Sequence, residues 1–198
     1  MHQVLVIAAS QQKASQSRKV ADYINHQVEN LGANASVLDL GKTVLPLWSG
    51  EPAPDKSLIN TIRDQLNHAT SFVFVVPEWN GMAPPAIKNL LTWFGADQFA
   101  HKPVLLCAVS AGQGGAFVIS ELRGSSYKNC RICYLPEHLI IRSVGNVLEG
   151  VSPMGKSDNY YRNRIDFVLK DLLDYDLALS TIRPHALERM EDFPNGMS

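Results

Sequence analysis

Residues 72–93 read FVFVVPEWNGMAPPAIKNLLTW, and this stretch decides the fold. Its first five residues are all apolar, which is typical of a strand that is buried on both faces of a sheet. Pro84 and Pro85 then indicate the start of a helix, because a first-turn proline gives up no intrahelical hydrogen bond. Asn80 and Gly81 lie between strand and helix and allow a sharp turn with exposed N–H groups. Open α/β sheets bind ligands at such a loop, beyond the carboxyl end of a buried strand.

The rest of the chain alternates strand and helix patterns around this unit. Strands are predicted over Val4–Ala9, Ala35–Leu40, Ser71–Val76, Pro103–Val109 and His138–Val144. Helices are predicted over Ser17–Leu31, Lys56–Ala69, Pro85–Phe94, Gly115–Asn129 and Asn159–Ile182. This alternation predicts a parallel sheet covered by helices on both faces. Five strands favour the flavodoxin-like three-layer sandwich with order 2-1-3-4-5, in which loops after the first, third and fourth strands meet at the ligand site.

Length and charge narrow the class of protein. The chain has 198 residues and a formal net charge of −1, and we expect one domain over residues 1–198. Lys and Arg are scattered, which removes the main electrostatic drive for binding nucleic acid or an anionic membrane. The segment Met1–Ala9 lacks a basic region, and its apolar run is too short for a signal peptide or a membrane span. We therefore expect a cytoplasmic protein with neither a nucleic-acid nor a membrane partner.

The cysteines and histidines show no pattern of a metal or redox centre. Three cysteines are too few for a disulfide framework. Cys130 and Cys133 form a C-x-x-C pair, but it follows a predicted helix, whereas a redox-active thiol needs the amino end of a helix. No second pair of ligands has the spacing of a zinc site, and the six histidines lack metal-ligand spacing. The sequence therefore predicts no metal site.

The segment after the first strand, Ser10–Arg18, is rich in hydroxyl and amide groups and leads into a helix. Free N–H groups and the helix dipole favour an anion at that point. The candidate phosphate ligands are Ser10, Gln12, Ser15, Gln16 and Ser17. For this pattern alone, simple N-capping of the helix by Ser15 or Ser17 is the alternative. The segment is neither G-x-G-x-x-G nor a P-loop, which argues against resident NAD and against ATP chemistry.

Two further loops are expected at the same edge of the sheet. The candidate ligands are Pro77, Glu78, Trp79, Asn80 and Gly81 after the third strand, and Ser110, Gly112, Gly114 and Gly115 after the fourth. Glycines let the backbone approach a flat ligand closely, and backbone N–H groups stabilise negative charge on it. The Glu78 carboxylate would repel such charge, so we expect it to point toward backbone or solvent. A glycine-rich turn without a ligand is the alternative for residues 110–115 alone.

These loops resemble those of the NADPH-dependent FMN reductase family. Residues 77–93 resemble the signature P-E-Y-N-G-S-x-P-x-x-L-K-N-A-I-D-W, residues 9–21 resemble the phosphate loop G-S-x-R-x-x-S-x-N-x-x-L-A, and residues 110–115 resemble S-x-G-x-x-G-G. The departures from these motifs include Ala9, Gln12, Ser17, Val20, Trp79 and Met82. Gln12 replaces an arginine, which removes a contact typically worth about 1.5–3 kcal/mol. Lys13 or Arg18 is the candidate to supply that charge.

The resemblance implies an oxidoreductase that binds FMN and uses NADPH or NADH as co-substrate. Hydride from the nicotinamide reduces the flavin, and two electrons then go to a small-molecule electron acceptor such as a flavin, a quinone, an azo compound or a metal oxyanion. The cofactor performs this chemistry, so no catalytic side chain is predicted. Members of the family commonly form homodimers or homotetramers through the helix at residues 85–94, which suits the position of Trp93.

Two other functions fit the same fold. A flavodoxin-like electron carrier is usually strongly acidic for docking to basic partners, and a net charge of −1 speaks against it. A flavodoxin-fold binding or regulatory protein with weak or no FMN binding is supported by the departures at Gln12, Ser17 and Met82. Two measurements distinguish the reductase from these two alternatives: whether the protein binds a flavin, and whether NADPH or NADH reduces that flavin directly.

Overall fold

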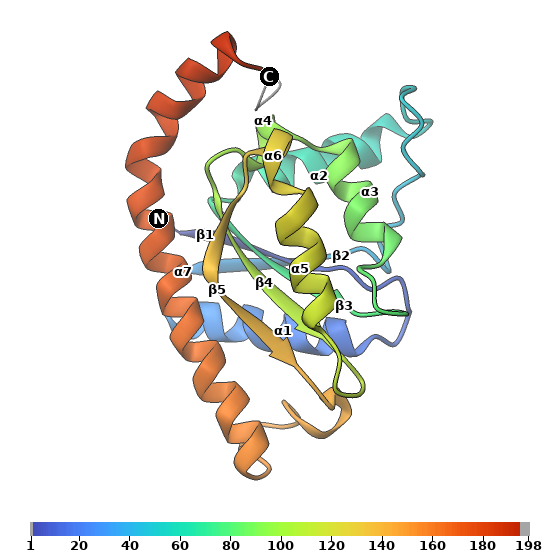
Figure 1. The fold of residues 1–198 in the computed structure, drawn as a ribbon, viewed down its shortest axis with the longest axis vertical. Helices are drawn as coiled ribbons and strands as arrows, with labels where there is room; N and C mark the ends of the chain where they lie inside the picture. The colour runs from blue at the N-terminus through green and yellow to red at the C-terminus, as the bar shows by residue number, and fades with distance from the viewer. Residues whose placement is uncertain (1, 195–198) are drawn as a thin grey trace.

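The computed structural model describes residues 2–194, and its five strands form one parallel sheet (Figure 1). The strands are β1 (Gln3–Ala8), β2 (Asn34–Asp39), β3 (Ser71–Pro77), β4 (Pro103–Val109) and β5 (Cys133–Ile141). Their order is β2-β1-β3-β4-β5, which confirms the predicted flavodoxin-like topology. Every residue of β3 and β4 is buried, as expected of central parallel strands with unbroken apolar sequences.

Helices cover both faces of the sheet, which confirms the predicted three-layer sandwich (Figure 1). One face is covered by α1 (Gln16–Asn30) and α7 (Lys156–Arg189). The other is covered by α2 (Lys56–His68), α3 (Pro85–Trp93), α4 (Ala96–Phe99), α5 (Ala116–Ser125) and α6 (Tyr127–Cys130). Two short 3-10 helices, η1 (Val144–Asn146) and η2 (Met190–Asp192), flank α7.

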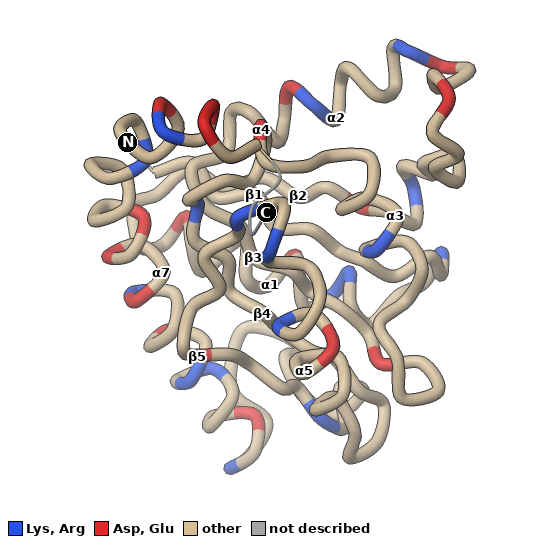
Figure 2. Tube along the Cα trace, turned by 45° about the horizontal axis from the view of Figure 1, so that its top comes forward, with Lys and Arg blue, Asp and Glu red and all other residues tan. Residues whose placement is uncertain are grey.

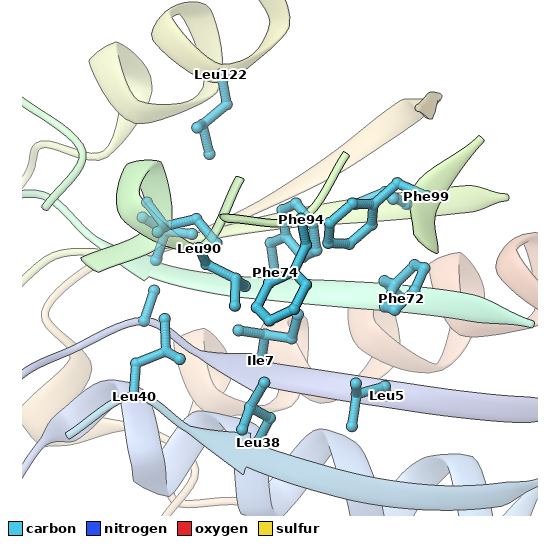
Figure 3. Close-up of a cluster of buried hydrophobic side chains, with 14 of the residues drawn as sticks. Leu5, Ile7, Leu38, Leu40, Phe72, Phe74, Leu90, Phe94, Phe99 and Leu122 are labelled. Carbon is cyan, nitrogen blue, oxygen red and sulfur yellow. The ribbon is translucent and has the colours of Figure 1, made fainter. Parts of the chain in front are cut away.

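Each face of the sheet has its own hydrophobic core. The core beneath α2, α3 and α5 contains the fully buried side chains of Phe72, Phe74, Phe94 and Phe99 (Figure 3). The rings of Phe72 and Phe99 lie 5.0 Å apart between centroids, and such pairs add about 0.5–1.5 kcal/mol beyond the area they bury. The core beneath α1 and α7 consists mainly of Val, Leu and Ile side chains. Together the two cores hold the carboxyl ends of the strands, and hence the loops that follow them, in fixed positions.

The prediction for the fifth strand is wrong in its position. A strand was expected at residues 138–144, but β5 spans Cys133–Ile141, and the chain leaves the strand before Ser143, whose φ is 47°. Pro136 hid the first half of the strand, because proline cannot donate to the ladder. It is tolerated here because β5 lies at the edge of the sheet.

Two helix predictions also need correction. The helix expected over residues 115–129 is divided into α5 and α6 at Ser126, whose Oγ donates to the Leu122 carbonyl (2.7 Å). The helix expected over residues 159–182 is longer at both ends, and Pro184 lies inside it. The buried side chain of Ala186 packs beyond that proline. α4 was not predicted, whereas the remaining predicted elements are confirmed to within one residue at each end.

Acidic and basic residues are mixed over the molecule rather than separated (Figure 2). α7 carries both Lys or Arg and Asp or Glu residues along its length. In the described range 2–194, no helix combines the length and the apolar character needed to cross a membrane.

Candidate functional site

Three loops leave the sheet side by side at its carboxyl edge (Figure 1). They are residues 9–15, 78–84 and 110–115, and they follow the adjacent strands β1, β3 and β4. The Ala9 N–H donates to the Val75 carbonyl (2.9 Å), and the Glu78 N–H donates to the Val109 carbonyl (2.9 Å). These bonds extend the ladder to the first residue of two loops. The structure therefore brings together the three loops that the sequence singled out.

The loop after β1 opens onto the amino end of α1. Ser15 is the N-cap residue, and its Oγ accepts a hydrogen bond from the Arg18 N–H (3.2 Å). The Ser10 Oγ accepts from the Gln12 N–H (3.2 Å). The first N–H groups of a helix have no intrahelical partner, so those of Gln16 and Ser17 are available to an anion. Ser10 and Ser17 are buried, whereas the side chains of Gln12 and Gln16 are exposed.

The charge of Arg18 is already neutralised. Its Nε donates to Asp22 (2.8 Å) and its Nη1 donates to Asp39 (3.1 Å). The bond to Asp22, followed by its charge and that of Asp39, outweighs burial and raises the pKa of Arg18. Arg18 therefore does not replace the arginine of the family motif, and Lys13 is the exposed cation of the loop.

Gly41, just beyond β2, packs against the same loop. A Cβ atom on Gly41 would lie 2.9 Å from the Ser10 carbonyl oxygen. The Gly41 N–H donates to Asp39 Oδ1 (2.9 Å), so the turn after β2 supports the first loop. The motif comparison did not identify Gly41, because it lies outside the three motifs.

Asn80 and Gly81 are the tip of a short β-hairpin with a two-residue loop. Trp79 and Met82 pair as an antiparallel bridge, with N–H to carbonyl distances of 3.0 and 2.9 Å. The φ angles of Asn80 and Gly81 are 52° and 73°. Positive φ at both central positions is typical of a type I′ turn, for which Asn-Gly is the preferred sequence. Both tip residues are exposed, so their N–H groups can meet a ligand.

The Glu78 carboxylate points at backbone, as expected. Its Oε2 accepts a hydrogen bond from the Phe117 N–H (3.1 Å) in the first turn of α5. The positive end of the helix dipole stabilises a carboxylate there. Gly114 provides the space, since a Cβ atom on it would lie 2.3 Å from Glu78 Oε1.

The loop after β4 begins with the same kind of turn as the loop after β1. The Ser110 Oγ accepts from the Gly112 N–H (3.2 Å), and the Arg142 Nε donates to the carbonyls of Gln113 (2.7 Å) and Gly114 (3.0 Å). Gly115 has a φ of 105°, and a Cβ atom on it would lie 2.5 Å from the Ile140 side chain. Arg142 was not predicted, because it follows the strand whose position the sequence misplaced.

Side-chain hydrogen bonds and an ion pair hold the start of α3 in place. Glu121 accepts from the Ala83 N–H (2.7 Å) and forms an ion pair with Lys88. Burial alone would raise the pKa of Glu121, but the bonds from Lys88 and Ala83 lower it below its ordinary value. Asn89 Nδ2 (2.9 Å) and Trp93 Nε1 (2.8 Å) both donate to the Pro46 carbonyl. These contacts give Lys88, Asn89 and Trp93 roles in packing.

Apolar side chains surround the three loops. Val44, Leu47, Trp48, Met82 and Phe117 are exposed, with Leu47 reaching 82% and Met82 52%. A pocket of about 130 Å³ is lined by residues of the first loop, the segment after β2 and the start of α3. The carboxyl edge therefore presents polar loop backbone beside an apolar rim.

The C-x-x-C pair takes no part in this edge. Cys130 ends α6 and Cys133 begins β5, so the pair lies at the carboxyl end of a helix, as predicted. Burial raises the pKa of both thiols. The thiols therefore stay protonated near neutral pH and are poor nucleophiles. In the part of the chain that the structure describes, no group of three His, Cys, Asp or Glu residues could hold a metal ion.

The groups at this edge have the chemistry that FMN requires. Hydroxyls and free helix N–H groups suit its phosphate, and glycine-containing turns with exposed N–H groups suit its flat ring. The sheet order and the loops at its switch point define a flavodoxin-like protein.

The family model of the NADPH-dependent FMN reductases matches residues 2–145, and the chain belongs to this family. It is 31% identical over 124 residues to an NADPH azoreductase of Bacillus sp. (strain OY1-2), covering 62% of this chain and 67% of that protein. It is 27% identical over 124 residues to a quinone reductase of Pseudomonas putida, covering 59% and 64%. The chain thus spans about two thirds of the length of these curated relatives.

Solved structures agree on the fold. FerB, a flavoenzyme NAD(P)H:(acceptor) oxidoreductase of Paracoccus denitrificans, has a TM-score of 0.71 at 18% identity, covering 90% of this chain and 98% of that one. An NAD(P)H:quinone oxidoreductase of Methanothermobacter marburgensis has a TM-score of 0.61 at 14% identity, covering 86% and 98%. Family and fold together make this chain an oxidoreductase of the NAD(P)H-dependent FMN reductase type, with FMN as its cofactor.

Proposed function

We propose that the three loops hold FMN, with its phosphate at the amino end of α1 and its ring between the turn at Asn80 and the loop after β4. The assigned ligands are Ser10, Gln12, Ser15, Gln16, Ser17, Pro77, Glu78, Trp79, Asn80, Gly81, Ser110, Gly112, Gly114 and Gly115. One observation carries the proposal: the open helix terminus and the type I′ turn follow strands that are neighbours in the sheet.

The protein binds and orients the cofactor, which when bound supplies two-electron transfer from NADPH or NADH. The hydroxyls of Ser10 and Ser15 and the first N–H groups of α1 bind the phosphate. The N–H groups of Asn80 and Gly81 stabilise negative charge at the ring edge. The Phe117 N–H holds the Glu78 carboxylate, so this charge is kept from turning toward the ring.

The apolar rim points to a hydrophobic electron acceptor. Leu47, Trp48 and Phe117 expose large apolar surfaces beside the loops, and such surfaces mark binding sites for apolar partners. We infer that quinones or azo compounds are the acceptors of this chain. The names of two relatives, NADPH azoreductase and quinone reductase, support this choice.

We also infer a single FMN-binding domain that acts as a homodimer or homotetramer in the cytoplasm. Three free cysteines suit a reducing compartment. Next to α3, a cavity of about 280 Å³ lies between Lys88 and Lys128, and Tyr127 is exposed beside it. A second copy covering this face would bury that surface.

Flavin spectroscopy tests the function. The purified protein, saturated with FMN and freed of excess, is titrated with NADPH or NADH without oxygen while the flavin absorbance is recorded. We expect stoichiometric FMN and rapid loss of its absorbance, followed by recovery when a quinone or azo compound is added. FMN binding without reduction by either nicotinamide would favour an electron carrier. If FMN neither binds nor raises the thermal midpoint, the proposal fails and the binding or regulatory alternative is preferred.

A further inference from the structure

A second pocket, of about 180 Å³, lies at the opposite edge of the sheet. It is bounded by the residues that lead into β3 and β4 and by the second half of α7. The seven residues of β4 separate it from the carboxyl edge, a distance of roughly 20 Å at about 3.3 Å per residue. The FMN site does not use any of its residues.

Three of its lining residues are basic: His101, Lys102 and Arg183. Lys102 is only 2% exposed, and its Nζ donates to the carbonyls of Leu66 (2.8 Å) and Asn67 (3.5 Å). The Arg183 Nε donates to the Ala100 carbonyl (3.1 Å). Over residues 2–194 the Arg183 Nη groups donate to no protein acceptor, and neither Lys102 nor Arg183 forms an ion pair. These contacts satisfy hydrogen bonds but leave the positive charges without a counter-ion.

The carboxylate in the pocket is committed elsewhere. Asp176 is buried, and its Oδ2 accepts from Thr70 Oγ1 (2.8 Å) and pairs with His2 Nδ1 (2.6 Å). Burial, followed by the charge of Arg183, lowers the pKa of Lys102 to about 7, although Asp176 opposes the shift. The net field on the lysine is therefore positive, and a bound anion would relieve it.

The positive charge of Arg183 also acts on His101. Burial lowers the pKa of this histidine, and the charges of Arg131, Arg183 and Arg189 lower it further. His101 also has a φ of 56°, and its N–H donates to the carbonyl of Arg131 (2.9 Å), whose own φ is 53°. Non-glycine residues in the left-handed region cost energy and cluster at ligand sites.

We propose that this pocket binds a small oxyanion, a carboxylate or a phosphate group, between Arg183 and Lys102 with His101 at its side. A purely structural role explains only part of the arrangement. Lys102 caps the last carbonyls of α2, which accounts for that side chain. It does not account for the free Nη groups of Arg183 or for the open pocket beside them. An anion bound here would link the second half of α7, through Arg183, to Lys102 at the start of β4.

Binding of inorganic phosphate to the FMN-saturated protein tests this proposal. FMN fills the phosphate loop of α1, so added phosphate reports on other sites. Calorimetry and thermal midpoints are measured at constant ionic strength, with chloride as the reference. We expect saturable binding, and Arg183→Gln should weaken it about tenfold or more, because a hydrogen bond to a charged group is typically worth about 1.5–3 kcal/mol.

Lys170→Gln is the matched control. It removes one positive charge from an exposed position of the same helix, where Lys170 pairs with Asp166 (2.7 Å), and it should leave the affinity unchanged. Ser180→Glu is a second variant, since Ser180 is exposed on α7 at the pocket and its replacement should not disturb folding. The new carboxylate should abolish phosphate binding by repulsion.

Ser180 is far from the loops at the carboxyl edge, so Ser180→Glu separates the two sites even in protein without FMN. A parallel titration with acetate distinguishes a carboxylate site from a phosphate site. The proposal is overturned if neither anion shows saturable binding, or if Arg183→Gln and Ser180→Glu bind as tightly as Lys170→Gln.

Discussion

Glu78 and Gly114 fit together so closely that a Cβ atom on the glycine would lie 2.3 Å from the carboxylate Oε1. The two residues belong to loops that follow the neighbouring strands β3 and β4. The other carboxylate oxygen is bonded to the Phe117 N–H (3.1 Å). The carboxylate therefore joins both loops to the first turn of α5, and the two sides of the proposed ring site are coupled.

Gly114→Ala should disrupt the hydrogen bond between Glu78 and Phe117. The methyl group would displace the flexible end of the Glu78 side chain from Phe117, and we expect the loss of about one hydrogen bond, about 0.5–1.5 kcal/mol in the free energy of unfolding, together with weaker FMN binding. Urea denaturation and flavin titration measure the two effects. Gly145→Ala is the control, because a Cβ atom there meets nothing within 4 Å and Gly145 is not among the assigned ligands. Equal effects of the two substitutions would contradict the coupling.

Ser15→Ala should weaken FMN binding beyond its effect on stability. Loss of an N-cap side chain costs about 1 kcal/mol of stability, and Ser15 caps α1. Asp55 caps α2 through bonds to the N–H groups of Ser57 (2.9 Å) and Leu58 (3.1 Å), so Asp55→Ala is a matched control. Both variants should lower the thermal midpoint similarly, but only Ser15→Ala should raise the FMN dissociation constant. A similar rise in Asp55→Ala would mean that Ser15 acts only as a cap.

Gly81→Ala should strain the type I′ turn. Its φ of 73° costs an L-residue about 1–2 kcal/mol, so the variant should be less stable by that amount. Asn80→Gly should change stability by only a few tenths, because glycine also favours positive φ. Chemical denaturation of both variants checks this. If the two lose equal stability, the turn does not have the backbone conformation seen here.

Stability should rise with pH between about 7 and 8.5 because of Lys102. Its folded pKa of about 7 lies below the usual unfolded value near 10.4, so the unfolded chain binds more protons across this range. The free energy of unfolding should therefore increase by roughly 1–2 kcal/mol over the range, and Lys102→Met should remove this increase. His101 and His138, whose pKa values are lowered, act mainly below the range. Burial raises the pKa of the three thiols, and because an unfolded thiol ionises at about pH 8.5, they oppose the rise at the upper end of the range. The contribution of Lys102 is therefore the difference between the unchanged protein and Lys102→Met.

Urea denaturation at several pH values, in buffers without phosphate or carboxylate, measures this slope. Lys170→Met, at an exposed position, is the control and should keep the slope of the unchanged protein. A slope that persists in Lys102→Met would show that another group causes it.

Local patterns predicted most of the fold and the position of the site. Unbroken apolar runs identified β3 and β4, and the Asn-Gly pair indicated the turn between Trp79 and Met82. The start of β5 was missed because Pro136 counts against a strand in the local pattern. The predicted order 2-1-3-4-5 places the fifth strand at the edge, so the topology, and not the local pattern, is what allows a proline there.

Supporting side chains were missed for a different reason. Arg142 reaches back from the end of β5 to the loop after β4, and Glu121 reaches from α5 to the Ala83 N–H (2.7 Å). Such contacts join segments separated by tens of residues, and neither residue has a local sequence pattern that reveals its target. Arg18 was a candidate phosphate ligand because of its position in the sequence, but its side chain forms ion pairs with two carboxylates. The sequence alone does not reveal these ion pairs.

The segment after β2 is held differently from the three loops. Asn89 and Trp93 bind it at the Pro46 carbonyl, and Asn89 Oδ1 accepts from the Trp48 N–H (2.9 Å), while Val44 and Leu47 project outward. The exposed side chains of Val44 and Leu47 can therefore be exchanged without disturbing the backbone of the cofactor loops, whereas Gly41, at the start of the segment, supports the first loop. Selection for new acceptors can act on this segment at little cost to flavin binding, which makes it the natural place to diversify in a library of engineered reductases.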